Sequence, residues 1–310
     1  MTRFLLRRIA YAVPVLLGVA LITLFLFHIA GGDPVAIKLG KNPDPAEVEA
    51  LRQELGLYDS FARQYVEFIR QTVTFDYGRS WADDTPVREI FRRGLFPTLS
   101  VSVPGFLIGV FLAIAVSLLV AVVRGSLLDR TVTALAVAGI SISSLVYILL
   151  GQWLLADQWK WFPVWGFSYG PGAVVFVALP ILIWVALSVG TDVRYFRTVI
   201  LEEIGQDYVR TARAKGLSET RVMVAHVLRN SLIPIVTRMT IAVPFLITGS
   251  FLLEIFFGIP GLGSTLFTAI QNSDLPVVKA FTMVGAVLYV FFNIVADLLY
   301  AVVDPRIRLE

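Results

Sequence analysis

Cysteine is absent from this 310-residue chain, which excludes disulfides, thiolate metal sites and a cysteine nucleophile. Charged residues are few: they make up 16% of the sequence, against about 25% in a soluble domain. The chain also lacks the Gly-x-x-x-x-Gly-Lys-Ser/Thr loop that binds nucleotide phosphates. No group of residues has metal-ligand spacing, and no nucleophile is paired with a base. We therefore expect a protein that is not an enzyme and has no catalytic residues, metal site or cofactor of its own.

Hydrophobic residues, in contrast, make up 57% of the chain, and the mean hydropathy is +0.77. They gather in blocks of about twenty residues, the length that crosses a hydrocarbon core ~30 Å thick. The blocks predict an all-α, polytopic membrane protein with about six transmembrane helices, at 9–30, 98–123, 131–156, 173–193, 233–257 and 276–303. The first block follows Arg3, Arg7 and Arg8 and is longer than the apolar run of a signal peptide, so we interpret it as an uncleaved helix.

The blocks divide the chain into three parts: 1–30 is a tail with the first helix, 31–97 is an extracytoplasmic helical segment, and 98–310 is a transmembrane core. Lysine and arginine concentrate near the two termini and in the short connections on the same side as them, above all in the loop 194–234. The positive-inside rule therefore places both termini and this loop in the cytoplasm. Three tryptophans that follow the third block, Trp159, Trp161 and Trp165, are typical of anchors at the membrane interface.

The extracytoplasmic segment carries helix signals of its own. Asp44 is an N-cap followed by proline, an apolar stripe follows, and Gly56 offers a stop. A second helix carries Phe61, Tyr65 and Phe68, and a short third one starts at Pro86 and includes Phe91. We expect these aromatic side chains to pack onto the membrane helices rather than to hold a ligand.

The cytoplasmic loop 194–234 predicts two helices joined by a tight turn. The first covers 202–215, Gly216 ends it, and Ser218 caps a second helix with Val222 and Ala225 near one face. Such a unit could be a solvated connector, a DNA-binding helix-turn-helix or a docking element for a soluble subunit. Four acidic residues dilute its positive charge and both ends are tied to membrane helices, so we favour docking and expect no nucleic-acid partner.

Two stretches of this loop, 210–216 and 228–234, resemble the "EAA" loop of binding-protein-dependent ABC import permeases. In that pattern Ala212 is the last alanine and Gly216 is the glycine, whereas Arg210 stands where the family has glutamate. Further motifs resemble the "B"-type subunit of the dipeptide/oligopeptide branch, and together they cover nearly the whole chain: Arg7-Arg8, Gly32-Asp33-Pro34, 54–57, 76–80, 97–99, 258–263, 297–300 and 304–308.

The resemblance implies a type I ABC importer permease fold in the cell inner membrane. It further implies a second, different "C"-type permease subunit in the bilayer, two cytoplasmic ATPases that bind ATP and Mg, and an external substrate-binding protein. The ATPase-coupling residues that it implies are Arg210, Thr211, Ala212, Arg213, Ala214, Lys215, Gly216, Leu217, Ser218, Val222, Ala225 and Pro234. The substrate stays open among peptides, nickel, sugars, opines and antimicrobial peptides.

Glu254 and Asp297 fall inside predicted membrane helices, where charge is costly and function is the default hypothesis. Glu254 lies late in the fifth helix, where it could line the pore or sit at the outer interface. Asp297 lies in the sixth helix, as a gate candidate or a helix–helix hydrogen-bond partner. Such carboxylates also leave open an ion-coupled secondary transporter, and a membrane scaffold without transport activity is a third alternative.

Overall fold

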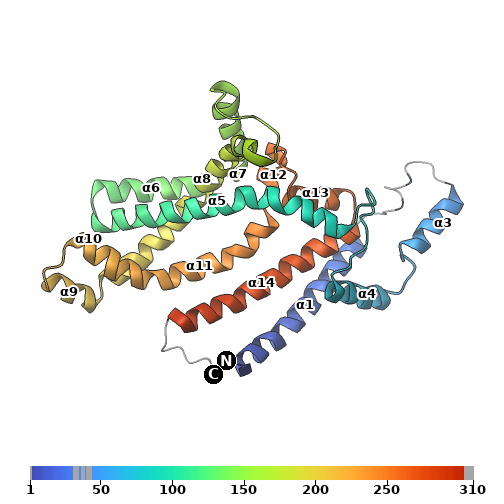
Figure 1. The fold of residues 1–310 in the computed structure, drawn as a ribbon, viewed down its shortest axis with the longest axis horizontal. Coiled ribbons are helices and arrows are strands. Elements are labelled where there is room, and N and C mark those ends of the chain that lie inside the picture. Colours follow the sequence, from blue (N-terminus) through green and yellow to red (C-terminus); the bar gives the residue numbers. More distant parts are fainter. Residues whose placement is uncertain (1, 31–34, 36–38, 40–43, 304–310) are drawn as a thin grey trace.

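The computed structural model describes residues 2–30, 35, 39 and 44–303. All regular structure in these ranges is helical, which confirms the all-α prediction. Two of the family-like motifs, 32–34 and 304–308, lie outside the described residues. Five long helices run through the molecule (Figure 1): α1 (Thr2–Ala30), α5 (Val87–Val122), α8 (Ala173–Ile204), α11 (Arg229–Thr248) and α14 (Leu275–Val303).

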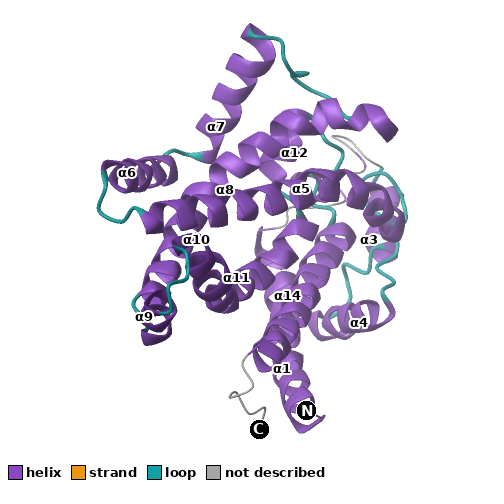
Figure 2. Ribbon diagram, turned by 60° about the vertical axis from the view of Figure 1, so that its left-hand side comes forward, coloured by secondary structure: helices purple, strands orange, loops and turns teal. Residues whose placement is uncertain are grey.

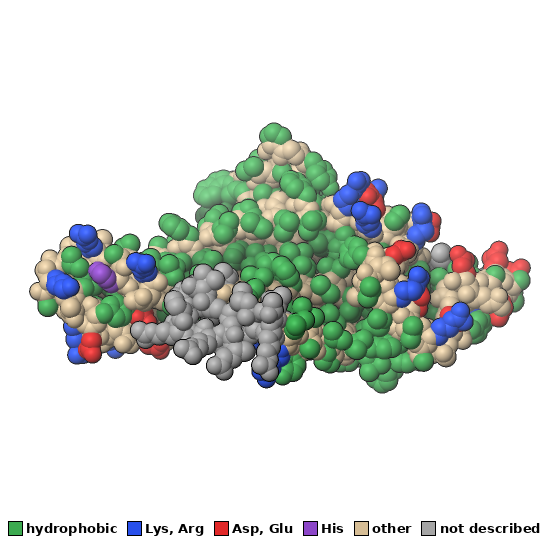
Figure 3. Space-filling model, turned by 60° about the horizontal axis from the view of Figure 1, so that its bottom comes forward, with side chains coloured by type: hydrophobic (Ala, Val, Ile, Leu, Met, Phe, Trp, Pro, Cys, Tyr) green, Lys and Arg blue, Asp and Glu red, His purple; other side chains and the backbone are tan. Residues whose placement is uncertain are grey.

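Within the described ranges, five helices are long and apolar enough to cross a membrane, and the number rises to seven if each of two bent helix pairs is one span. The predicted number of about six lies within this range. Charged side chains gather at the two ends of the molecule and leave a broad hydrophobic zone between them (Figure 3). The protein is therefore a multi-pass membrane protein.

The close approach of α5 to α8 follows from small residues on α5. Gly105, Gly109, Ala113 and Ser117 recur at every fourth position, and all are buried. A Cβ atom at position 105 would lie 2.8 Å from Cγ of Trp184, so only glycine allows this packing. The Ser117 hydroxyl donates a hydrogen bond to the Val193 carbonyl at 3.0 Å. Small residues and interhelical hydroxyl bonds are the usual means of holding helices together in lipid.

For two segments the prediction of one continuous helix is wrong, because the chain breaks and bends within each of them. The predicted helix 131–156 is α6 (Leu127–Ser141) followed by α7 (Ser144–Gly151) and the wide π-type turns η1 (Gln152–Gln158), at 96° to α6. Figure 2 shows α7 standing away from the bundle. The predicted helix 233–257 ends early, at Thr248, since Gly249 takes φ 76°. Then α12 (Phe251–Phe257) and α13 (Leu262–Gln271) meet at 90°.

Two other helices are longer than predicted. Helix α5 begins at Val87, so the expected separate helix at 86–91 is its first turn. Helix α8 continues to Ile204 rather than ending at Val193, because nothing in its last eleven residues interrupts the hydrogen-bond ladder.

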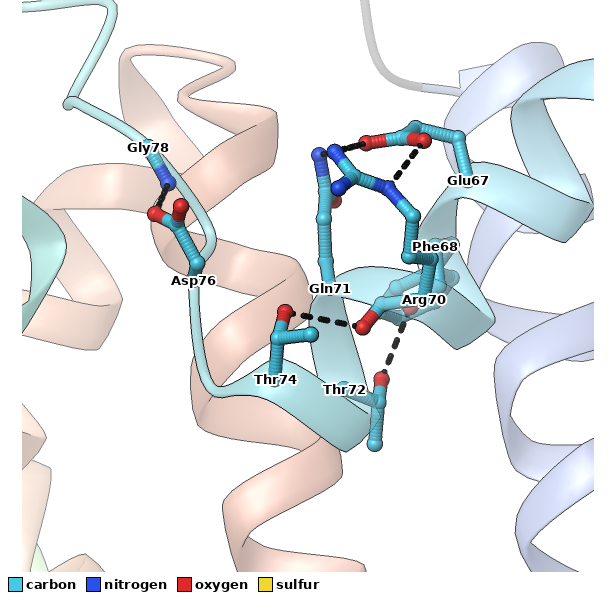
Figure 4. A network of polar contacts seen from close by, with 8 residues as sticks. All are labelled: Glu67, Phe68, Arg70, Gln71, Thr72, Thr74, Asp76 and Gly78. Atoms are coloured by element: carbon cyan, nitrogen blue, oxygen red, sulfur yellow. Dashed lines mark hydrogen bonds and ion pairs between the residues drawn. The ribbon is translucent and has the colours of Figure 1, made fainter.

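The first two helices predicted within residues 31–97 are confirmed. Asp44 caps α3 (Pro45–Glu54) by accepting a bond from the Ala46 amide at 3.0 Å, and Gly56 has φ 64°. Ser60 caps α4 (Phe61–Thr74), whose last turn appears in Figure 4. There the threonine hydroxyls bond back to helix carbonyls and Arg70 pairs with Glu67, which lowers the pKa of that carboxyl.

The aromatic residues of α4 pack onto the membrane helices, as expected from the sequence. Phe68 is fully buried in a cluster with Ala20 of α1 and Met283 of α14. The Tyr65 hydroxyl donates to the Leu17 carbonyl of α1 at 3.0 Å. Helix α4 is therefore fixed to the bundle through α1 and α14.

Candidate functional site

The predicted two-helix unit forms a knob at one end of the molecule, which we define as residues 207–228 (Figure 1). It consists of α9 (Asp207–Ala214), the short α10 (Glu219–Arg221) and the wide turns η3 (Val222–Leu228). The first helix starts at Asp207 and not at Glu202, because the chain leaves α8 at Gly205 and is extended at Gln206. The second helix runs without a break into α11, so Pro234 lies inside a helix rather than at the end of a loop.

Gly216 forms the turn between the two helices of the knob. Its φ is 76°, and its amide bonds to the Arg213 carbonyl at 2.9 Å. Left-handed backbone of this kind favours glycine by about 1–2 kcal/mol over other residues. Ser218 stands at the cap position of α10, but its side chain makes no capping bond there. The glycine therefore determines the turn.

The apolar side of the knob faces inward. Val209, Ala212, Val222, Met223 and Val227 are buried in a cluster with residues of α5 and α8. Ala212 and Val222 therefore support the shape of the knob. Sequence reasoning missed Met223 and Val227.

The outward side of the knob is open and mostly polar, although Val224 is also exposed there. The predicted coupling residues that are exposed are Arg210, Thr211, Arg213, Ala214, Lys215, Gly216, Ser218 and Ala225, and Leu217 is half-buried. Arg210, which departs from the family pattern, only approaches Asp207 at 3.5 Å, and 76% of its side chain is exposed. Its guanidinium is thus available for contacts outside this chain.

One ion pair closes the knob across its turn. Arg213 binds Glu219 through Nε at 3.1 Å and Nη2 at 2.5 Å, and this contact raises the pKa of the guanidinium. At the base of the knob the Tyr208 hydroxyl donates to the Glu203 carboxylate. Partial burial together with this bond raises the pKa of Tyr208 to about 12, so the phenol is neutral at physiological pH.

The two carboxylates singled out in the sequence have different surroundings. Asp297 pairs with Arg8 at 2.8 Å, which joins α14 to α1 near the ends of the chain. Glu254 lies in α12 beside the bend and is almost fully buried. It accepts bonds from the Thr98 hydroxyl and the Ser264 amide, both at 2.8 Å. A Cβ at Gly261 would lie 2.5 Å from its carboxyl carbon, so the bend closes tightly around it.

An ion pair that sequence reasoning missed joins α8 to α11. Nε of Arg238 on α11 donates to Oδ1 of Asp192 on α8 at 3.0 Å, and the guanidinium lies 4.9 Å from the centre of the Tyr195 ring. Both charges line a cavity of about 470 Å³ between α5, α8 and α11. The signal was in the sequence, because Arg238 lies within the predicted span 233–257, where a charge is unusual.

The comparisons with known proteins agree with this arrangement. Residues 105–309 match the family model described as the binding-protein-dependent transport system inner membrane component, and residues 1–102 match the model for its N-terminal part. The chain is 35% identical to a peptide transport system permease protein of Brucella abortus, over the full length of both. It is 34% identical to the dipeptide transport system permease protein DppB of Escherichia coli, over 99% of each chain. This chain therefore belongs to the family of binding-protein-dependent transport system inner membrane components and is a transmembrane permease subunit of an ABC importer.

Proposed function

We propose that this permease carries peptides or a related small solute across the inner membrane by alternating access, driven by two partner ATPases. An external binding protein delivers the solute, and a different "C"-type permease completes the pore. Both termini and the knob lie in the cytoplasm in this proposal. The peptide substrate is supported by the names of the relatives, which are peptide and dipeptide permeases.

The observation that carries the coupling role is the two-sided construction of the knob. Its apolar side chains pack against α5 and α8, while its outer side presents polar residues on a rigid turn. A soluble partner that pushes on this side would move the two helices of the knob together with α8. The reason is that Val209 and Val222 of the knob share one core with Ile200 of α8. A coupling element does work only if its contacts differ between two states of the partner.

Purification of the complex from membranes tests this proposal. A permease subunit is expected to bring down ATPase copies and a second membrane chain, and its binding protein with peptide is expected to stimulate ATP hydrolysis. A secondary carrier would bring down neither. Recovery of the chain alone, with peptide uptake that follows an ion gradient, would refute the proposal.

Variants of the knob separate its two sides. Gly216→Pro is expected to abolish uptake with normal membrane insertion, because proline fixes φ near −65° and cannot replace the φ of 76°. Ala212→Asp would bury a carboxylate in the apolar core, and uptake is expected to be lost with the knob's shape. Ala214→Asp is the matched control: it adds the same charge on the exposed side, so the knob is expected to keep its shape. Normal ATPase docking and uptake in both Gly216→Pro and Ala212→Asp would contradict the coupling role.

A further inference from the structure

The cavity between α5, α8 and α11 combines apolar walls with an incompletely bonded ion pair. Its walls include Phe106, Val110, Trp184 and Phe245, and Thr237 is also among the lining residues. Sites for small molecules have this composition: mostly apolar lining, a few placed polar groups, and a volume of roughly 300–1,000 Å³. At about 470 Å³ the cavity falls within that range.

The ion pair in the cavity uses only part of its bonding capacity. Among the described residues, Arg238 reaches Asp192 through Nε alone, and no bond is present from its two terminal nitrogens or to Oδ2 of Asp192. The side chain of Arg238 is 39% exposed, so part of it faces open space, while its guanidinium also lies 4.9 Å from the centre of the Tyr195 ring. A guanidinium offers five N–H donors in a planar fork that matches a carboxylate.

A second pair on α8 shows what a closed contact looks like in this protein. Arg197 holds Asp129 of α6 with two parallel bonds of 2.8 and 2.9 Å, and the Gly125 amide fills a further acceptor position at 2.8 Å. That carboxylate side chain is only 6% exposed. The pair of Arg238 and Asp192 lacks this closure, so a role limited to joining two helices leaves its geometry unexplained.

We propose that this cavity binds the charged ends of the transported solute, with the guanidinium of Arg238 taking a carboxylate and Asp192 taking an ammonium group. The chemical class is a short zwitterionic molecule such as a free peptide, and this inference rests on the proposed transport function. When the solute is absent the two residues pair with each other, which avoids an isolated charge at membrane depth. Apolar walls would then receive side chains of varied size without selecting among them.

The absence of cysteine gives a clean probe of this cavity. Thr237→Cys places a thiol among the lining residues, and Thr133→Cys is the matched control beside Asp129 and Arg197. Both threonines are half-buried. In vesicles that contain the whole transporter, maleimide labelling of this chain is measured against rising concentrations of dialanine, dialanine amide and N-acetyl-dialanine.

Dialanine is expected to slow labelling at position 237 but not at position 133. Loss of one charged hydrogen-bond partner costs at least 1.5 kcal/mol, so the amide and the acetyl form should need about tenfold higher concentrations. Arg238→Gln should remove the preference for dialanine over its amide, and Asp192→Asn the preference over the acetyl form. Arg238→Lys keeps the charge without the fork and should show an intermediate preference.

The outcomes separate this inference from the transport function. If dialanine protects neither thiol, or if the preference for free ends persists in Arg238→Gln and Asp192→Asn, the inference is overturned. If the complex assembles and imports peptide all the same, the proposed function stands without it. If Arg238→Gln fails to insert into the membrane, Asp192→Asn alone decides between the outcomes. The inference holds if this variant loses the preference for dialanine over N-acetyl-dialanine and is overturned if the preference persists.

Discussion

Helix α8 contributes one residue to each of two aspartate–arginine pairs. The pairs have the same chemistry but differ in how many hydrogen bonds they make. Toward its end, Arg197 grips Asp129 of α6 with two bonds, and the carboxylate is closed off from solvent. Closer to its middle, Asp192 meets Arg238 of α11 with one bond at the edge of a cavity. The first pair uses its donors and acceptors within the chain, whereas the second leaves several unused. The number of satisfied positions around a charge therefore distinguishes a joint between helices from a candidate binding site.

The largest expected effect is on the closed pair. Breaking a buried ion pair from one side costs about 3–5 kcal/mol, because the remaining charge loses its partner. We expect Asp129→Asn to lower the free energy of unfolding by about this amount. The same change at Asp192 keeps an acceptor oxygen for Nε of Arg238 and removes only the negative charge, so it should cost about 1 kcal/mol. Thermal unfolding of the two variants in one detergent measures the difference.

Equal losses of stability in Asp129→Asn and Asp192→Asn would break the comparison. Such a result would mean that Arg238 depends on its partner as strongly as Arg197 does. The pair in the cavity would then only hold α8 and α11 together. Peptide uptake gives the second measurement. If the pair of Asp192 and Arg238 only holds two helices together, Asp192→Asn should lose uptake in proportion to stability. If it binds the solute, the variant should lose uptake at nearly full stability.

Much of the fold could be predicted because its signals are local. Blocks of apolar residues located the long helices, and the predicted cap Asp44 and stop Gly56 lie at the two ends of α3. The turn at Gly216 was predicted for the same reason, since a positive φ at a helix end is a property of a few adjacent residues.

The bends and the ion pairs could not be predicted because they depend on distant parts of the chain. Hydropathy continues through Gly249 and Ser250, so a continuous apolar run conceals the break at α12. Arg238 meets a residue 46 positions away, and Arg197 one 68 positions away. A charge in a membrane span can be noted from sequence, but its partner needs the packed structure.

The second knob helix does not have the apolar face that its sequence predicted, for a physical reason. A spacing of 3.6 residues placed Val222 and Ala225 on one face. The structure buries Val222 and Val227 and leaves Ala225 exposed. Residues 222–228 form wide π-type turns, in which neighbours along a face are five residues apart. Nothing in the local composition marks that widening.

Glu254 extends the comparison to a carboxylate that accepts hydrogen bonds from a hydroxyl and a backbone amide. Glu254→Ala would leave the Thr98 hydroxyl and the Ser264 amide without this acceptor, at a cost of about 1–3 kcal/mol for an unpaired buried donor. Glu254→Gln keeps one carbonyl oxygen and is expected to lose less. Thermal unfolding of the two variants provides the test. A pore-lining role predicts the opposite pattern, in which uptake falls in both variants while stability is unchanged.

The smallest effect is expected at the exposed pair of the knob, Arg213 and Glu219, whose side chains are 41% and 45% exposed. Exposed ion pairs contribute about 0–1 kcal/mol, so Arg213→Glu should scarcely change thermal unfolding. Its effect should lie in ATPase co-purification, because two carboxylates facing each other across Gly216 would open the turn. The exchange Arg213→Glu with Glu219→Arg restores the pair with reversed charges. If the pair only holds the turn closed, the double variant recovers ATPase binding. If binding stays lost although the turn is closed again, each charge contacts the partner directly, and the pair belongs with Asp192 and Arg238 rather than with Asp129 and Arg197.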